Sequence, residues 1–276
     1  MADGACWWSV VLLTPAACLL IAALLVALVP ARSALRYYLC FAVYIGASSA
    51  VALACMPALC LRPFRVHNSR LMAQILKHFT KLLGITWELR HGEILAEDRG
   101  AVIVANHQSI LDVLGMFNIW DVMGKCAAVA KNEVFYVWPF GLAAWLNGTV
   151  FIDRNNVHKA NEQITKAGFI IREEKVKLWI FPEGTRRTKD VPMLPFKRGA
   201  FRVAISCQVP IIPVVYSPYH FIDNRHKYFR RGKIVITVLP EIPTKGLTMA
   251  DVDTLMEDIR NKMVKTFEDI CRELTT

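Results

Sequence analysis

Two uncharged, apolar runs near the N-terminus constrain the fold of this chain more than any other feature of its sequence. The first covers 23 residues, 7–29, and the second covers 25 residues, 37–61. An α-helix needs about 20 apolar residues to cross the hydrocarbon core of a bilayer, so each run is long enough. We therefore expect an N-terminal two-helix membrane hairpin in residues 1–61, with its turn within residues 30–36.

The first run is unlike a cleaved signal peptide, because no basic residue precedes it and because it is longer than the apolar centre of such peptides. Small residues recur at every fourth position of the second run and form a ridge on which the first helix can pack: Ala42, Gly46, Ala50, Ala54 and Ala58. We expect this hairpin to be transmembrane, with both ends in the cytosol. The alternative is a hairpin that lies within one leaflet without spanning the membrane.

The positive charge of the chain lies almost entirely after the two runs. The net charge is +10, and the charged residues within 1–61 are Asp3, Arg32 and Arg36. A basic cluster follows the second run directly: Arg62, Arg65, Arg70, Lys77 and Lys81. Such a cluster favours the cytosolic side and anionic lipid head groups. The sequence contains no nucleic-acid-binding motif, so we expect membrane lipids and an anionic substrate as partners, and no nucleic acid.

Residues 62–276 are predicted to form one α/β domain. Short β-rich runs alternate there with helical patterns, which favours a single mixed, largely parallel sheet flanked by helices. Strands are expected at residues 86–89, 101–105, 150–152, 178–181, 211–215 and 234–239. Helices are expected at residues 77–83, 155–172, 199–207 and 251–274, the last with a capping box of Thr248 and Asp251.

One stretch, residues 134–151, does not fit this alternation, because it contains no charge in 18 residues. It includes Trp138 and Trp145, and Pro139 and Gly141 interrupt it, which argues against a spanning helix. A core helix and a segment in contact with the membrane explain the stretch equally well.

His107 follows the predicted strand 101–105 directly and precedes Asp112 by five residues. In open α/β sheets, ligands bind beyond the carboxyl ends of the strands. A turn between the two residues would bring the carboxylate to one ring nitrogen, which fixes the tautomer and leaves the other nitrogen as a base. Taken alone, this spacing is more often a structural hydrogen bond.

Two further strand ends deliver polar side chains. The predicted strand 150–152 leads into Arg154, and the strand 178–181 is followed by Glu183, Gly184, Thr185 and Arg186. Arginine suits a phosphate because its planar guanidinium donates two parallel hydrogen bonds. The alternative for each arginine is a surface ion pair with a neighbouring carboxylate.

Four motifs in order resemble the glycerolipid acyltransferases with a His-x4-Asp signature, specifically the 1-acylglycerol-3-phosphate (lysophosphatidic acid) acyltransferases of the endoplasmic reticulum. They are NHQSILD at 106–112, GTVFIDR at 148–154, FPEGTR at 181–186 and VPIIPV at 209–214. KNE at 131–133 and PFKRG at 195–199 also fit, although Asn132 stands where this family usually has a basic residue. The resemblance extends from near residue 30 to the C-terminal helix.

The resemblance implies transfer of a fatty acyl group from acyl-CoA to the sn-2 hydroxyl of lysophosphatidic acid, giving phosphatidic acid. It implies a multi-pass protein of the endoplasmic reticulum membrane with a cytosolic catalytic domain. His107 is implied as general base and Asp112 as its orienting partner. The implied substrate-binding residues are Lys131, Arg154, Glu183, Gly184, Thr185, Arg186 and Lys197. Acyl-CoA is then a co-substrate, and no cofactor and no metal are expected.

Other functions stay open beside this one. A thioester is already activated, so acyl transfer requires no covalent intermediate, and the sequence has no GxSxG elbow. Ser109, between His107 and Asp112, is the candidate nucleophile of a hydrolase. Further alternatives are another acceptor, such as glycerol 3-phosphate or another lysophospholipid, and a non-catalytic membrane scaffold. The presence of Glu183 and Arg186 beside the His107–Asp112 pair argues against the scaffold.

Overall fold

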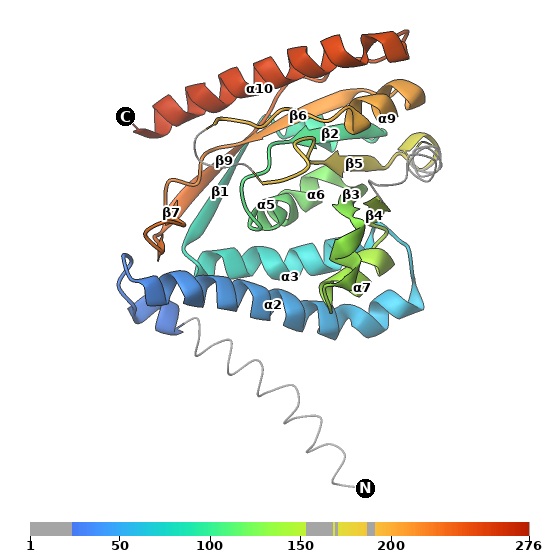
Figure 1. Cartoon of the computed structure of the whole chain (residues 1–276). Coiled ribbons are helices and arrows are strands. Elements are labelled where there is room, and N and C mark those ends of the chain that lie inside the picture. Colours follow the sequence, from blue (N-terminus) through green and yellow to red (C-terminus); the bar gives the residue numbers. More distant parts are fainter. Residues whose placement is uncertain (1–23, 153–167, 169–170, 187–190, 276) are drawn as a thin grey trace, which may run out of the picture.

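The computed structural model of this chain describes residues 24–152, 168, 171–186 and 191–275 (Figure 1). Its centre is a seven-stranded sheet with the order β1-β9-β6-β2-β5-β3-β4. The strands are β1 (Ile85–Arg90), β2 (Ala101–Ala105), β3 (Cys126–Lys131), β4 (Val150–Ile152), β5 (Lys177–Ile180), β6 (Ile211–Tyr216) and β9 (Gly232–Val238). Paired strands in this sheet run parallel except β6 and β9, which are antiparallel. The predicted mixed, largely parallel sheet is confirmed.

All six predicted strands are present, but β3 was not predicted. Its sequence, CAAVAK, is rich in alanine, which is uncommon in strands, and pairing with β5 and β4 stabilises it instead. β7 (Ile222–Asp223) and β8 (Tyr228–Phe229) form a separate two-stranded sheet. These strands were not predicted either, because they are too short to show a sequence pattern.

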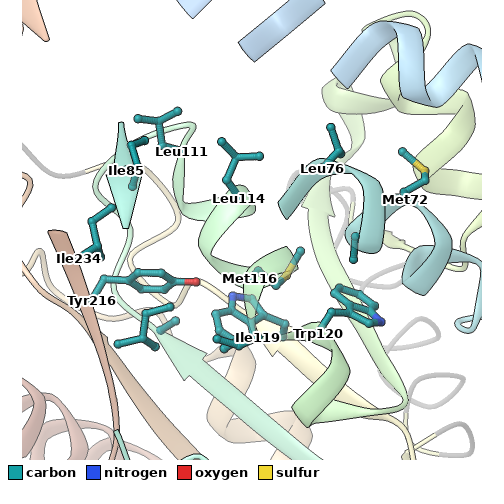
Figure 2. Packing of buried hydrophobic residues seen from close by; sticks show 14 of the residues in the cluster. Met72, Leu76, Ile85, Leu111, Leu114, Met116, Ile119, Trp120, Tyr216 and Ile234 are labelled. Carbon is teal, nitrogen blue, oxygen red and sulfur yellow. The ribbon is translucent and has the colours of Figure 1, made fainter. Parts of the chain in front are cut away.

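Helices cover both faces of the sheet, as expected. On one face lie α3 (Asn68–Leu82), α5 (Asp112–Asn118) and α6 (Trp120–Met123), and on the other lie α9 (Gly199–Cys207) and α10 (Val252–Thr275) (Figure 1). All residues of β2 are apolar because both faces of this strand are covered. Ile103 packs in the cluster that contains Trp120, whereas Val104 packs in the cluster that contains Ile259. Figure 2 shows the first of these clusters, where α3, α5 and the sheet meet.

The predicted helices are present where the structure describes them, although α3 begins at Asn68, well before the expected residue 77. The expected helix at 199–207 is α9, and the expected helix at 77–83 is the end of α3. The capping box is present before α10, at the start of η2 (Met249–Asp251): the Thr248 backbone N–H donates to Asp251 Oδ2 at 2.7 Å. The expected helix at 155–172 lies mostly outside the described residues, although residues 168, 171 and 172 are helical.

Within the described ranges, one helix is long and apolar enough to cross a membrane, α2 (Ala34–Leu61). Residues 24–28 are helical and lead into it through a bend, in the region where the turn was expected. The rest of the first apolar run, residues 7–23, lies outside the described residues, so the two-helix hairpin stays a prediction. The small-residue ridge of α2 includes the exposed Ala42, Ala54 and Ala58, and the packing of the first helix on it also stays a prediction.

The opposite face of α2 packs on the α/β domain, and its buried residues belong to the same hydrophobic cluster as the sheet. Three polar side chains fix this arrangement. Arg36 is buried and donates to the carbonyl oxygens of Val26 and, at 2.9 Å, Phe229. The Tyr37 hydroxyl donates to Asn224 at 2.9 Å, and the Tyr44 hydroxyl donates to the carbonyl oxygen of Ile110 at 3.0 Å. Helix α2 is therefore part of the folded core.

The uncharged stretch at 134–151 is not one helix. It contains the end of η1 (Asn132–Tyr136), then α7 (Phe140–Leu146), and finally β4. Ala143 and Leu146 of α7 are buried in the core, whereas Tyr136 and Trp138 lie on the surface. One part of the stretch therefore contributes to the core and another part does not.

Close approach of α5 to the sheet depends on Gly115. A Cβ at this position would lie 2.4 Å from the Tyr216 ring and 2.7 Å from the Trp87 ring. Gly115→Ala should therefore lower stability by about 1–3 kcal/mol through overpacking, visible as a lower melting temperature of the purified protein in detergent. Gly199→Ala in α9 is the matched control, because a Cβ there meets nothing within 4 Å. Equal melting temperatures for the two variants would contradict this packing.

Candidate active site

The carboxyl ends of three neighbouring parallel strands bring the candidate residues to one edge of the sheet. Strand β2 leads into His107, β5 leads into Glu183, and β3 ends at Lys131. Because β2, β5 and β3 are adjacent and parallel, these three ends lie side by side. The strand-end positions expected from the sequence are confirmed for His107 and Glu183, whereas the position of Lys131 at the end of β3 was not predicted.

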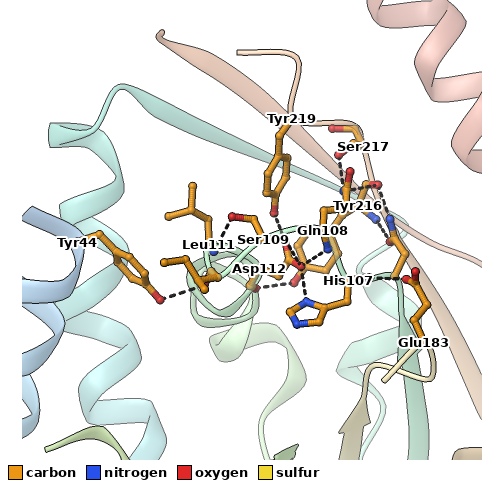
Figure 3. Close-up of polar contacts among 12 residues, drawn as sticks. Tyr44, His107, Gln108, Ser109, Leu111, Asp112, Glu183, Tyr216, Ser217 and Tyr219 are labelled. Atoms are coloured by element: carbon orange, nitrogen blue, oxygen red, sulfur yellow. Dashed lines mark hydrogen bonds and ion pairs between the residues drawn. The ribbon is translucent and has the colours of Figure 1, made fainter. Parts of the chain in front are cut away.

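The predicted contact between His107 and Asp112 is present. Nδ1 of His107 lies 2.7 Å from Oδ2 of Asp112 (Figure 3). Asp112 is the first residue of α5, and the turn at residues 106–111 brings its carboxylate back to the ring. The Asp112 side chain is 0% exposed, whereas the His107 side chain is 22% exposed. The pair therefore has a buried acid and an accessible imidazole.

The Asp112 carboxylate accepts hydrogen bonds from three further donors. The backbone N–H groups of Gln108 and Ser109 donate to Oδ2 at 2.6 and 3.0 Å, and the Tyr219 hydroxyl donates to Oδ1 at 2.5 Å. Every partner is a donor, which is the environment that stabilises the ionised carboxylate. Burial, together with the charge of Asp112, raises the pKa of Tyr219 well above its usual value, so its hydroxyl keeps the proton that it donates.

The imidazole of His107 is oriented by these contacts. Since the acidic partner faces Nδ1, this nitrogen carries the donated proton and Nε2 is left as the basic nitrogen. The ring also stacks on Phe181, with centroids 4.3 Å apart and an interplanar angle of 22°. Two independent contacts therefore fix the direction in which Nε2 points.

Glu183 holds the backbone of this site. It is buried, and its Oε1 accepts from the backbone N–H of His107 at 2.7 Å while Oε2 accepts from that of Leu194 at 2.9 Å. The carboxylate thus joins the end of β5 to the turn after β2 that contains His107, and to the loop before α9. This contact gives Glu183 a positioning role, and the substrate contact expected from the sequence stays a prediction.

The other expected substrate-binding residues lie around this centre. Gly184 adopts a positive φ of 72°, which turns the chain after Glu183, and Thr185 and Arg186 follow on the surface. Lys131 and Lys197 are exposed, and the backbone N–H of Lys197 donates to the carbonyl oxygen of Pro182 at 2.8 Å. Arg154 lies outside the described residues, so its place in the site stays a prediction.

Ser109 is not arranged as a nucleophile. Its Oγ accepts a hydrogen bond from the backbone N–H of Leu111 at 3.2 Å and points away from the His107 ring (Figure 3). A serine nucleophile requires its hydroxyl within hydrogen-bond reach of the base. This geometry disfavours the hydrolase alternative.

Sequence reasoning missed the residues that support the pair from β6. Asn106 exchanges two hydrogen bonds with the backbone of Tyr216, at 2.7 and 3.1 Å, and the Tyr216 hydroxyl donates to the backbone oxygen of Asp112 at 3.1 Å. Tyr219 lies 107 positions after Asp112 in the sequence, so only the pairing of β2 with β6 brings them together. The available signal was the tyrosine-rich YSPY segment directly after the predicted strand 211–215.

Comparison with known proteins places this chain in a family. Residues 87–217 match the family model described as Acyltransferase. The chain is 37% identical to human 1-acyl-sn-glycerol-3-phosphate acyltransferase alpha over 85% of this chain and 82% of the relative. It is 38% identical to the human beta protein over 88% of this chain and 84% of the relative.

The fold is also similar to a solved structure. The crystal structure of the 1-acyl-sn-glycerophosphate (LPA) acyltransferase PlsC from Thermotoga maritima matches with a TM-score of 0.65, covering 86% of this chain and 94% of that chain. Its sequence identity is 22%, so this likeness concerns the fold alone. The sequence matches carry the assignment: this chain belongs to the family of 1-acyl-sn-glycerol-3-phosphate acyltransferases.

Proposed function

We propose that this protein transfers a fatty acyl group from acyl-CoA to the sn-2 hydroxyl of 1-acylglycerol 3-phosphate, giving phosphatidic acid. The observation that supports the proposal most directly is the His107–Asp112 pair, at 2.7 Å, in a chain whose relatives carry the name of this reaction. Phosphatidic acid would then serve phospholipid and triacylglycerol synthesis.

The proposed mechanism uses His107 as general base. Nε2 removes the proton of the sn-2 hydroxyl while that oxygen forms a bond to the thioester carbonyl carbon. The carbon–sulfur bond then breaks, and the imidazolium returns the proton to the departing sulfur of CoA. Asp112 holds the ring and stabilises the transient imidazolium. No bond between the acyl group and the protein forms, consistent with the engagement of Ser109 Oγ by Leu111.

We assign the acceptor phosphate to cationic side chains at the edge of the sheet that bears His107. Lys131 at the end of β3 and Arg186 on the loop after β5 are both exposed there, and Lys197 lies beside that loop. Arg154, Gly184 and Thr185 complete the substrate-binding set implied by the motifs. Glu183 acts in this scheme by holding the loop that carries Arg186.

We place the protein at the endoplasmic reticulum membrane, with its catalytic domain on the cytosolic side. Of the two hairpin arrangements, the packing of α2 favours the one that lies within one leaflet. A membrane-spanning α2 would have to leave the α/β domain, which would expose its buried face and break the hydrogen bonds of Arg36 and Tyr44. The multi-pass arrangement expected from the sequence is the alternative.

His107→Ala should remove nearly all acyl transfer while the melting temperature changes little. General base catalysis contributes about 10²–10⁴-fold, so a variant that keeps more than about a tenth of the wild-type kcat would refute the assignment. Asp112→Asn should also lose most activity, because an amide can hold the ring in the wrong tautomer. The measurement is release of CoA and formation of phosphatidic acid by the purified full-length protein.

Tyr219→Phe tests whether the hydroxyl on Asp112 positions the catalytic pair. A hydrogen bond to a charged group contributes about 1.5–3 kcal/mol, so kcat should fall about tenfold or more while both KM values change little. Tyr216→Phe is the matched control, since that hydroxyl reaches the backbone oxygen of Asp112 and not its carboxylate. Equal losses of kcat in both variants, tracking equal losses of melting temperature, would make the role of Tyr219 merely structural.

Arg186→Ala should raise the KM for the lysophospholipid acceptor about tenfold to a hundredfold and leave the KM for acyl-CoA nearly unchanged. Arg186→Lys should recover part of the loss, because an ammonium keeps the charge but not the two parallel hydrogen bonds. Arg272→Ala in α10 controls for the loss of a surface charge. An acyl-CoA KM raised as much as the acceptor KM would end the phosphate assignment.

A further inference from the structure

Three consecutive apolar residues are exposed at the end of η1 and in the segment that leads to α7. The exposed fractions are 77% for Tyr136, 53% for Val137 and 68% for Trp138. By contrast, Trp120 and Trp179 in the core are almost fully buried. A run of large apolar side chains in water is unfavourable, and a contiguous patch of them indicates a surface that something covers.

The exposed run is part of a larger, ordered patch. The Phe64 ring packs edge-on against Trp145 of α7 at 4.6 Å, and Phe135 packs against both Trp145 and Tyr136 at 6.2 and 5.4 Å. The backbone N–H of Phe64 donates to the carbonyl oxygen of Leu146 at 2.8 Å, which fixes the end of α2 to α7. We call the exposed members of this patch the aromatic rim: Phe64, Tyr136, Val137, Trp138 and Trp145.

The aromatic rim continues the exposed apolar face of α2. Leu61 is the last residue of α2, α7 packs on α2 near that end (Figure 1), and η1 packs on α7. Ile45 and Leu53 of α2 are exposed as well. Tyr136, Val137 and Trp138 follow Lys131, the carboxyl end of β3, after the short η1, so this part of the rim lies at the edge of the sheet that carries His107.

The flanking charges indicate what covers this surface. Arg62 and Arg65 are exposed beside Leu61 and Phe64, and Lys131 is exposed directly before η1. Tyrosine and tryptophan are stable at the membrane–water interface, where the ring lies in an apolar layer and its polar edge in a wet one, and neighbouring basic residues bind anionic head groups. This combination fits a bilayer surface that contains anionic lipid.

We propose that the aromatic rim is a membrane contact separate from the N-terminal apolar runs, and that it holds the catalytic edge of the sheet against the bilayer. An acyl acceptor with one long chain would then pass from the leaflet to His107 without crossing water. The contact itself does not depend on which acceptor the enzyme uses, although its benefit to catalysis rests on the function proposed above.

Fluorescence quenching of Trp138 tests the contact without any turnover. The full-length wild-type protein and Trp138→Phe are inserted into vesicles of phosphatidylserine and phosphatidylcholine brominated on the acyl chains. The chain has seven tryptophans, so the difference between the two emission spectra isolates Trp138. We expect this difference to be quenched by the brominated lipid and protected from aqueous iodide. Quenching of this emission by iodide and not by the lipid would overturn the proposal. The rim would then be exposed to water or covered by a protein partner.

A kinetic comparison tests the role in catalysis. The double variant Tyr136→Ser/Trp138→Ser should raise the KM for a long-chain acceptor presented in the same vesicles about tenfold, because it removes burial of two large side chains. The KM for a short-chain acceptor that is monomeric in water should stay unchanged. Met249→Ser, at an exposed apolar residue before α10, is the matched control and should change neither. Equal changes for both acceptors would show a structural defect and contradict the proposal.

These two experiments also distinguish a failure of the rim proposal from a failure of the proposed function. If the enzyme acts on a different acceptor, quenching of Trp138 by brominated lipid persists and only the choice of substrate in the kinetic arm has to change. If the rim does not touch lipid, the quenching arm fails while wild-type acyl transfer to lysophosphatidic acid remains.

Discussion

The buried carboxylate of Asp112 is the group on which the rest of the site depends. Removing a carboxylate from water is costly unless hydrogen bonds replace its hydration. Here the His107 ring, two backbone N–H groups of the turn and the Tyr219 hydroxyl do so together. These donors come from two segments far apart in the sequence, so the site forms only when β2, α5 and β6 are assembled. The same contacts that make the burial of Asp112 tolerable also aim Nε2 of His107 outward.

The turn that contains the His107–Asp112 pair is joined to the long apolar helix α2. Tyr44 in α2 donates to the carbonyl oxygen of Ile110, two residues before Asp112, and Figure 3 shows this contact beside the Asp112 network. On the other side, Glu183 holds the backbone N–H of His107. The turn that contains His107 is thus fixed between an apolar helix and the loop expected to bind phosphate. An enzyme whose acceptor is a lipid with an anionic head group needs both neighbours close to its base.

Sequence reasoning predicted the features that depend on local patterns. Apolar runs bounded by polar residues predicted strands such as β2 and β5, and periodic apolar residues predicted α9 and α10. The contact between His107 and Asp112 could be predicted because Asp112 is only five positions after His107, so that one turn brings them together. Strand β3 was missed because its alanine-rich sequence has little strand propensity of its own. The role of Tyr219 was missed because its contact with Asp112 depends on strand order. The packing of α2 on the domain was missed because a helix that is apolar on all sides does not reveal which side is buried.

If the base held by Asp112 serves acyl transfer to lysophosphatidic acid, the protein should select this acceptor from a mixture. The purified full-length protein is given labelled oleoyl-CoA with lysophosphatidic acid, glycerol 3-phosphate and lysophosphatidylcholine together, and the labelled products are identified. We expect phosphatidic acid as the main product, with one CoA released for each molecule formed. Free oleic acid in place of an acylated lipid, or another glycerolipid as the main product, would contradict it.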